Sequence, residues 1–181
     1  MIDMLELMKK EVQPYVIGVP DFILKPMVAE AMYDFCDESG AWTEDQIIGA
    51  YDNDIQLYPK DPINSVIIGV EWVKRKDSNS CYHHTFKMGK VILEFIPEAD
   101  IEIRVKLANN KNTNTLLVPD WFYNQHHRAI RSLTCYKLMT QDGKPWANAQ
   151  GAGFHYNKYR EYLGGGVIKA TPDRVHLRPF V

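Results

Sequence analysis

The stretch ADIEIRVKLA, residues 99–108, decides the fold class because its apolar and charged residues alternate strictly. The charged residues Glu102, Arg104 and Lys106 lie between the apolar residues Ile101, Ile103, Val105 and Leu107. A period of two residues is that of a β-strand with one buried and one solvated face. The stretch therefore predicts a half-buried strand, of the kind that antiparallel sheets contain.

Two more runs rich in β-branched residues surround it, SVIIGVEWVK (65–74) and KVILEF (90–95). Turn-forming motifs separate the runs: YDND, YPKDP, KDSNS, KMGK, IPEAD and ANNKNTN. Several short strands at this spacing are typical of an antiparallel sandwich or a barrel-like sheet. We therefore expect a β-rich segment over residues 42–118.

Outside that segment the apolar residues follow the helical period of 3.6. Helices are predicted over 1–12, from 22–26 to 38, over 120–139 with Asp120 as its cap, and from the cap Asn148 onward. Gly40 ends the second helix, and Pro26 falls in its second turn. The last helix shows an apolar stripe of Ala149, Ala152, Tyr156, Tyr159 and Leu163, and Gly164–Gly166 either end it or weaken it.

This order predicts an α+β protein in which a β segment is inserted into a bundle of about four helices. The helical core spans 1–41 and 119–170, and the inserted antiparallel β-sandwich-like subdomain spans 42–118. Residues 171–181, TPDRVHLRPFV, contain two prolines and no helical period. We expect them to form an extended C-terminal arm.

Composition is that of a globular protein of 181 residues, with 45% hydrophobic and 24% charged residues. No apolar run is long enough to cross a bilayer, and the N-terminus lacks the pattern of a secretory signal. Three scattered cysteines without a CxxC pair predict reduced thiols and a cytoplasmic origin.

Charge is divided unevenly along the chain. Residues 1–60 contain 12 acidic and 4 basic side chains, a net charge of −8, whereas residues 61–181 contain 11 and 17, a net charge of +6. Copies of the chain can pair head to tail through such an asymmetry, or the two halves can neutralise each other within one fold.

No motif of catalysis or cofactor binding is present. The adjacent pairs His83-His84 and His126-His127 point to different sides of a strand or helix, and neither has the spacing of a zinc site. There is no GxSxG elbow and no phosphate-binding loop, and Cys135 lies in the middle of a helix. The sequence predicts no catalytic residue, no metal and no cofactor. We expect His155 to donate a hydrogen bond at an interface between helices.

A basic cluster, VKRK (73–76), follows Trp72, and the arm adds Arg174, His176 and Arg178. Nucleic-acid binding is one interpretation of these charges. A pI near 6.3 is low for a DNA-binding domain, so docking of the arm into an acidic groove of a protein is favoured.

The segments FILKPMVAEAMYDFCDESGAW (22–42) and LLVPDWFYNQHHRAIRSLTCYKLMTQDGKPWANAQGAGFHYNKY (116–159), on either side of a β-rich middle, resemble the head-to-tail adaptor proteins of tailed bacteriophages. That family is also called gatekeeper or tail tubular protein A. The matching features are Phe35-Cys36 followed by Trp42, the PDW entry at 119–121, and the GKPW turn at 143–146 followed by Asn148. The resemblance covers nearly the whole chain and is carried by structural residues.

The resemblance implies a virion protein without enzymatic activity that is assembled in the host cytoplasm. Such adaptors form a dodecameric ring beneath the portal protein, retain packaged DNA, and provide the platform for the next tail protein. Their lumen passes DNA without sequence-specific binding, and no membrane is involved. Their C-terminal arm enters grooves between portal subunits. Here the arm would present Arg174, Val175, His176, Leu177, Arg178, Pro179, Phe180 and Val181, with Phe180 as its apolar anchor. Residues expected to pack helices or subunits are Trp121, Trp146, Gly151, Gly153, Tyr156 and Tyr159. The triple glycine at 164–166 departs from the alanine- and charge-rich helix of the family.

Two other classes of function remain open at this point. One is a β-sandwich module that binds a receptor or a glycan from a helical base, which exposed aromatic residues in the loops would favour. The other is a small hydrolase, which a crevice gathering His126, His155 and a carboxylate would favour.

Overall fold

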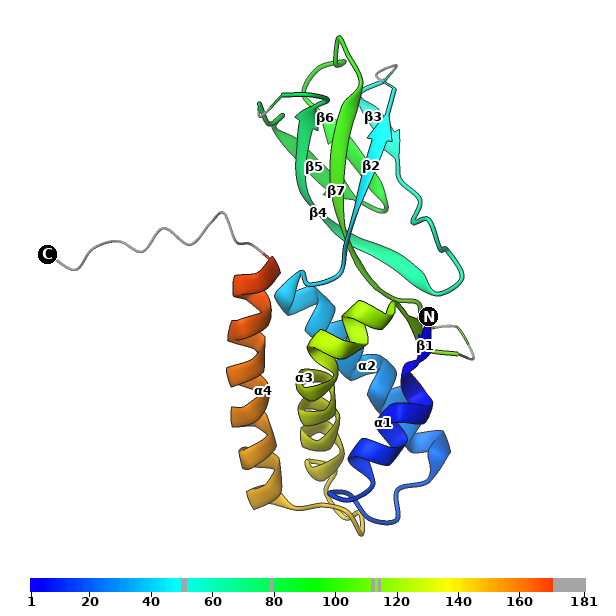
Figure 1. Ribbon diagram of the computed structural model, residues 1–181, viewed down its shortest axis with the longest axis vertical. Helices are drawn as coiled ribbons and strands as arrows, with labels where there is room; N and C mark the ends of the chain where they lie inside the picture. The colour runs from blue at the N-terminus through cyan, green and yellow to red at the C-terminus, as the bar shows by residue number, and fades with distance from the viewer. Residues whose placement is uncertain (50–51, 79, 112, 114, 171–181) are drawn as a thin grey trace, which may run out of the picture. The chain divides into compact units, whose positions relative to one another are not determined.

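The computed structural model describes all residues except 50–51, 79, 112, 114 and 171–181, and no side chains are described for 165–170. The described residues form a mixed α+β protein with four helices and three antiparallel sheets (Figure 1). They divide into two compact units. The helical unit comprises Met1–Ala41 and the residues from Lys111 on, and the β unit comprises Trp42–Asn110.

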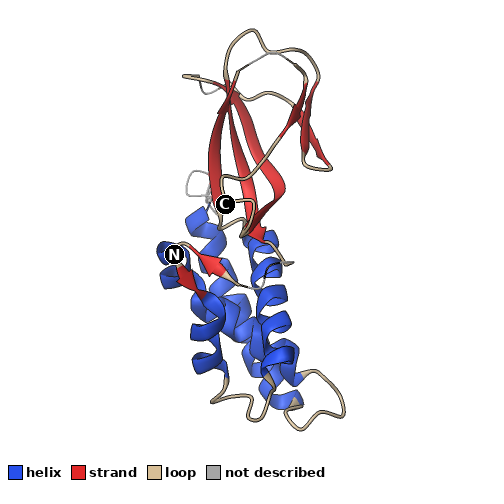
Figure 2. Ribbon diagram, turned by 90° about the vertical axis from the view of Figure 1, so that its right-hand side faces the viewer, coloured by secondary structure: helices blue, strands red, loops and turns tan. Residues whose placement is uncertain are grey.

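The helical unit contains α1 (Met4–Val12), α2 (Asp21–Ser39), α3 (Asp120–Met139) and α4 (Ala149–Ala170). Helix α3 contacts each of the other three helices, and α2 also contacts α1 and α4 (Figures 1 and 2). The helices bury long apolar side chains against one another, among them Met8, Leu24, Phe35, Phe122 and Leu138. Burial of this kind, rather than helix propensity, supplies most of the stability of such helices.

Local capping explains where the helices begin and end. The Asp3 carboxylate accepts from the backbone N–H of Leu5 at 3.0 Å, and the Asn148 side chain accepts from the N–H of Gly151 at 2.9 Å. Gly40 takes the left-handed conformation, with φ +60°, and its N–H bonds to the Cys36 carbonyl. The prediction for Asp120 was wrong. Pro119 occupies the N-cap position of α3, and Asp120 is the first helical residue. There the negative charge of Asp120 interacts favourably with the positive end of the helix dipole.

The starts of the first two helices differ from the predictions, and the structure decides where α4 ends, which the sequence left open. Residues Ile2–Asp3 form strand β1, which pairs antiparallel with β8 (Leu117–Val118), so the first helix begins only at Met4. This pairing places the residues after Lys111 in the helical unit, whereas the sequence suggested a boundary at 118. Helix α2 begins at Asp21 and continues through Pro26. Helix α4 continues through Gly164–Gly166 to Ala170.

The β unit contains two three-stranded antiparallel sheets. One has the order β2 (Thr43–Ile48), β7 (Ile101–Asn109) and β4 (Ser65–Arg75), and the other the order β3 (Asp54–Gln56), β6 (Lys90–Leu93) and β5 (His84–Lys87). The predicted alternation of β7 is confirmed, since Ile101, Ile103 and Val105 are fully buried and the intervening charged residues are half-buried. Val91 and Leu93 of β6 are buried as well.

The hairpin between β5 and β6 turns on two residues with positive φ, Met88 at +52° and Gly89 at +78°. Strand β3 holds the turn, because the Gly89 carbonyl accepts from the N–H of Leu57 and from the Gln56 side chain, both at 3.0 Å. Left-handed conformations suit glycine or asparagine and strain a bulky residue. Met88 is also 88% exposed, so its side chain does not offset the strain through contacts.

Candidate interaction surface on helix α4

Helix α4 buries one side against the rest of the helical unit. Over residues 149–164, whose side chains are described, the buried ones are Ala152, His155, Tyr159 and Leu163, at spacings of three and four residues. The predicted stripe was therefore wrong at two positions. Ala149 and Tyr156 are exposed, Tyr156 by 41%, and His155 lies on the buried side.

Gly151 lets the start of α4 approach the end of α3. A Cβ atom at Gly151 would lie 2.8 Å from the Met139 sulfur and 2.9 Å from the amide nitrogen of Asn148, the residue that caps the helix. Both distances are shorter than carbon contacts in folded proteins allow. A side chain at this position would therefore displace Met139 or the Asn148 cap, so packing within the chain itself favours glycine here.

Gly153 and Gly164 have no such reason within the described residues, because a Cβ atom at either would meet nothing within 4 Å. They are eleven residues apart, which is close to three helical turns, so they share one face of α4. Phe154 lies next to the first of them and is 57% exposed. Glycine in a helix interior costs roughly 1 kcal/mol relative to alanine. The exposed side of α4 thus carries two glycines, which leave the helix backbone uncovered, and a large exposed aromatic ring.

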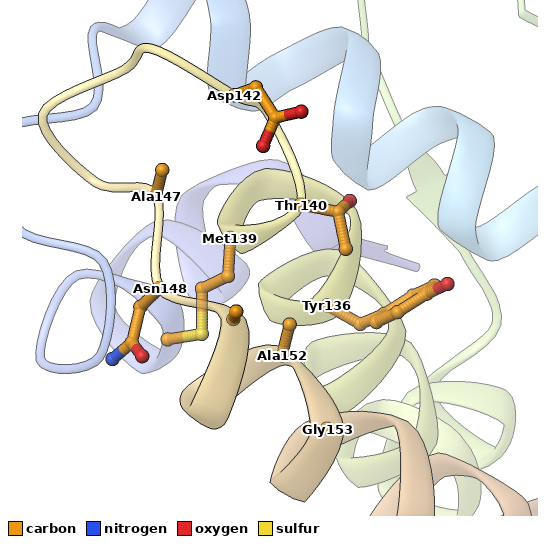
Figure 3. A pocket seen from close by; sticks show the side chains of 9 residues that line it. Tyr136, Met139, Thr140, Asp142, Ala147, Asn148, Ala152 and Gly153 are labelled. Carbon is orange, nitrogen blue, oxygen red and sulfur yellow. The ribbon is translucent and has the colours of Figure 1, made fainter.

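A hollow of about 390 Å³ opens beside this face, where the end of α3 meets the start of α4 (Figure 3). Its walls are mostly apolar and include Tyr136, Met139, Ala152 and Gly153. Asp142 contributes a carboxylate to it. A shallow apolar recess of this kind accepts a side chain of another polypeptide more readily than it encloses a small molecule.

Tyrosine rings line the α3–α4 contact. The rings of Tyr136 and Tyr156 lie 4.9 Å apart, and those of Tyr156 and Tyr159 lie 6.4 Å apart. The Tyr159 hydroxyl is buried near Glu38, and burial, followed by the charge of Glu38, raises its pKa. Tyr159 is therefore a core residue of this unit, whereas Tyr156 is partly exposed and packs its ring on Tyr136 at the edge of the contact.

The two tryptophans among the predicted packing residues lie within the helical unit. Trp121 is 44% exposed, and its ring meets that of Phe122 edge to face. Trp146 is half-buried in the α3–α4 turn and donates to the Gln141 side chain at 3.2 Å. The arm residues Arg174 to Val181 fall outside the described residues.

The histidines of this unit occupy separate environments. His126 is buried between the rings of Phe35 and Phe122, and His127 stacks on Tyr123. His155 lies against Tyr15, and its Nδ1 atom makes no hydrogen bond within the described part of the chain, so this atom does not make the predicted hydrogen bond between helices. Among those residues no three potential metal-ligating side chains come together.

The buried thiols are held in their protonated form. Burial raises the pKa of Cys36, and it raises the pKa of Cys135 to about 12. Thiols of this kind are poor nucleophiles. Cys81 is exposed in the β unit.

Two members of the basic cluster beside Trp72 pair with carboxylates, Lys74 with Glu102 at 2.9 Å and Lys76 with Asp100 at 3.9 Å. Nearby, Arg104 pairs with Asp45 through two hydrogen bonds of 2.6 and 2.8 Å. The Lys74 and Arg104 cations lie 4.5 and 4.9 Å from the centre of the Trp72 ring. Sequence reasoning missed this network because its partners come from three strands far apart in the chain.

Among the helices of the described residues, none is long and apolar enough to cross a membrane. No protein-family model matches the chain, and no curated protein matches it.

Proposed function

We propose that this chain is a structural protein of a tailed-phage virion, a head-to-tail adaptor that forms a ring, docks on the portal protein and carries the next tail protein. In this role it has no catalytic activity and no cofactor. The ring helps to retain packaged DNA and surrounds the conduit through which DNA leaves. The sequence resemblance motivates the proposal, and the α4 surface gives it a physical basis.

The observation that carries the proposal is the exposed face of α4. Within the described residues, its glycines at 153 and 164 have open space beside the backbone, and Phe154, about a quarter turn around the helix, exposes an aromatic ring. A monomer gains nothing from this combination, since alanine would stabilise the helix. A second polypeptide gains close backbone approach and an apolar contact. Contact between unlike faces of neighbouring copies closes into a ring when the rotation between them closes.

The arrangement of the helices and strands is compatible with an adaptor. In the proposal the four helices act as a bundle that forms the wall of the ring, and the β unit, inserted between α2 and α3, acts as a sandwich-like subdomain that meets the tail. Each helix contacts at least two others, as a bundle requires. The two sheets of the β unit both contribute buried side chains.

Deletion of residues 171–181 tests the docking arm. In the proposal the arm reaches grooves of the portal, so a chain ending at Ala170 loses portal binding while its circular dichroism spectrum is unchanged. The assay is co-sedimentation of the purified protein with the portal protein from the same genome. Phe180→Ala and the double variant Arg174→Ala, Arg178→Ala separate the apolar anchor from the charged contacts. Undiminished binding of the truncated chain contradicts the arm assignment.

A further inference from the structure

Helix α4 has two different flanks on its exposed side. Successive residues of an α-helix lie about 100° apart around the axis, and residues seven positions apart nearly coincide. Gly153 and Arg160 therefore share one flank, whereas Phe154 and Glu161 share the other. All four residues are exposed.

The flank of Gly153 opens into the hollow between α3 and α4 (Figure 3). The hollow measures about 390 Å³, and Tyr136, Met139 and Ala152 give it apolar walls. A cavity of about 150 Å³ already holds a benzene ring, so the hollow has room for an aromatic side chain. Arg160 lies about two turns further along this flank, exposed and without an ion pair among the described residues.

The other flank carries an aromatic ring and a carboxylate. Phe154 is 57% exposed, and its ring meets that of His155 edge to face at 5.3 Å. Tyr15 lies against the same imidazole at 5.0 Å and is 47% exposed, so the apolar surface continues onto the connection between α1 and α2. Glu161 pairs with Lys158 at 2.8 Å, with both side chains partly exposed. An exposed pair of this kind contributes little to stability, so Glu161 can exchange it for another cation.

The groups on the two flanks occur at matching heights along the helix. Phe154 lies only about 1.5 Å further along the axis than Gly153, and Glu161 lies as little beyond Arg160. A long side chain on a helix leans toward the preceding turn, which brings the Phe154 ring level with the hollow. Rotation about an axis parallel to α4 leaves every height unchanged, so adjacent copies in such a ring meet at equal heights.

We propose that neighbouring copies pack their α4 helices side by side, with Phe154 of one copy in the hollow of the next and Glu161 paired with Arg160 across the same contact. This inference rests on the proposed ring and names the residues that hold its copies together. Unlike flanks meet, so the contact is heterologous. A two-fold axis parallel to α4 would instead bring Glu161 against Glu161, or Arg160 against Arg160, which is unfavourable.

Sedimentation velocity of the full chain, alone and with the portal protein, measures this association. Phe154→Ala removes the ring that fills the hollow, and loss of a buried aromatic anchor should weaken association about 30-fold. Phe22→Ala is the matched control, because Phe22 is 78% exposed in the same unit but lies on α2, outside the proposed contact. It should associate like wild type, and both variants should keep the wild-type circular dichroism spectrum.

Arg160→Glu and Glu161→Arg test the orientation of the contact. Either change alone brings like charges together between copies and should weaken association about tenfold. The double variant has an opposite pair across the contact again and should recover association. Adjacent positions on a helix do not face each other, so this recovery cannot arise within one chain.

Association of Phe154→Ala at the wild-type level overturns the inference, as does a double charge variant that associates no better than its single parents. A chain that never self-associates, alone or on the portal, overturns it as well. Portal-bound rings that are insensitive to all of these substitutions overturn the inference and leave the proposed function standing. Association that depends on Phe154 in a chain that does not bind the portal supports the inference and contradicts the proposed function.

Discussion

Replacing Gly153 by alanine separates what α4 needs for its own fold from what it offers to another chain. An added Cβ atom at this position meets nothing within 4 Å among the described residues. The substitution therefore brings the full helix-propensity gain of roughly 1 kcal/mol. For a chain of this length that corresponds to a rise of about 2–4 °C in the midpoint of thermal unfolding.

Gly151→Ala is the matched control, two residues away in the same helix. Its Cβ atom would lie 2.8 Å from the Met139 sulfur and would disturb the Asn148 cap. Overpacking costs typically 1–3 kcal/mol, which cancels or exceeds the propensity gain. The order of stability should be Gly153→Ala, then wild type, then Gly151→Ala.

Urea denaturation followed by circular dichroism at 222 nm measures this order on the isolated protein, and sedimentation with the portal protein measures assembly. Gly153→Ala should stabilise the isolated chain and weaken assembly, because the methyl group would occupy space that a neighbouring chain approaches in the proposed ring. A less stable Gly153→Ala monomer would show that this glycine has a role within its own fold. A more stable monomer that assembles like wild type would refute the idea that the glycine is kept for a partner.

Three further substitutions test the packing of both units. Met88→Asn should raise the free energy of unfolding by roughly 1 kcal/mol, because asparagine tolerates the left-handed turn conformation that strains an exposed methionine. Thermal unfolding measures this change, and a lower midpoint for the variant contradicts the turn assignment. Asp45→Asn should cost less than about 1 kcal/mol at pH 7, since its pair with Arg104 is 41% exposed on the carboxylate side. The hydrogen bonds from Arg104 hold the pKa of Asp45 below 3.8 in the folded protein. The stabilisation is therefore present above pH 3.8 and is lost as the pH falls through the lower folded pKa. Urea titrations should show a smaller difference in unfolding free energy between wild type and Asp45→Asn at pH 2.5 than at pH 7. Tyr123→Phe removes the hydrogen bond to Glu11 and should cost about 1 kcal/mol in the same urea assay, with an unchanged midpoint as the contrary result.

Local sequence signals predicted the parts of the fold that depend on neighbours in the chain. The alternation over 101–107, the left-handed Gly40 cap and the Asn148 cap each rest on a few consecutive residues, and all three are confirmed. The pairing of Ile2 with Val118 escaped prediction because two-residue strands carry no periodic signal. The continuation of α4 past its three glycines also depends on more than local propensity.

The candidate surface was predicted only in part. Sequence spacing assigned Tyr156 to the buried stripe and left His155 out. Both residues lie at helical spacing from Ala152 and Tyr159, so the spacing alone does not decide which one is buried. Packing against the rest of the helical unit buries His155. Gly151 and Gly153 look alike in the sequence. Their roles differ because one faces Met139 and the other faces open space.

Electron microscopy of the full chain mixed with the portal protein of the same genome shows whether the exposed face of α4 joins polypeptides. We expect rings of this protein bound to the portal, with the face of Gly153 and Gly164 buried between neighbouring chains. Rings in which this face remains open to solvent would contradict it, as would monomers that never associate with the portal.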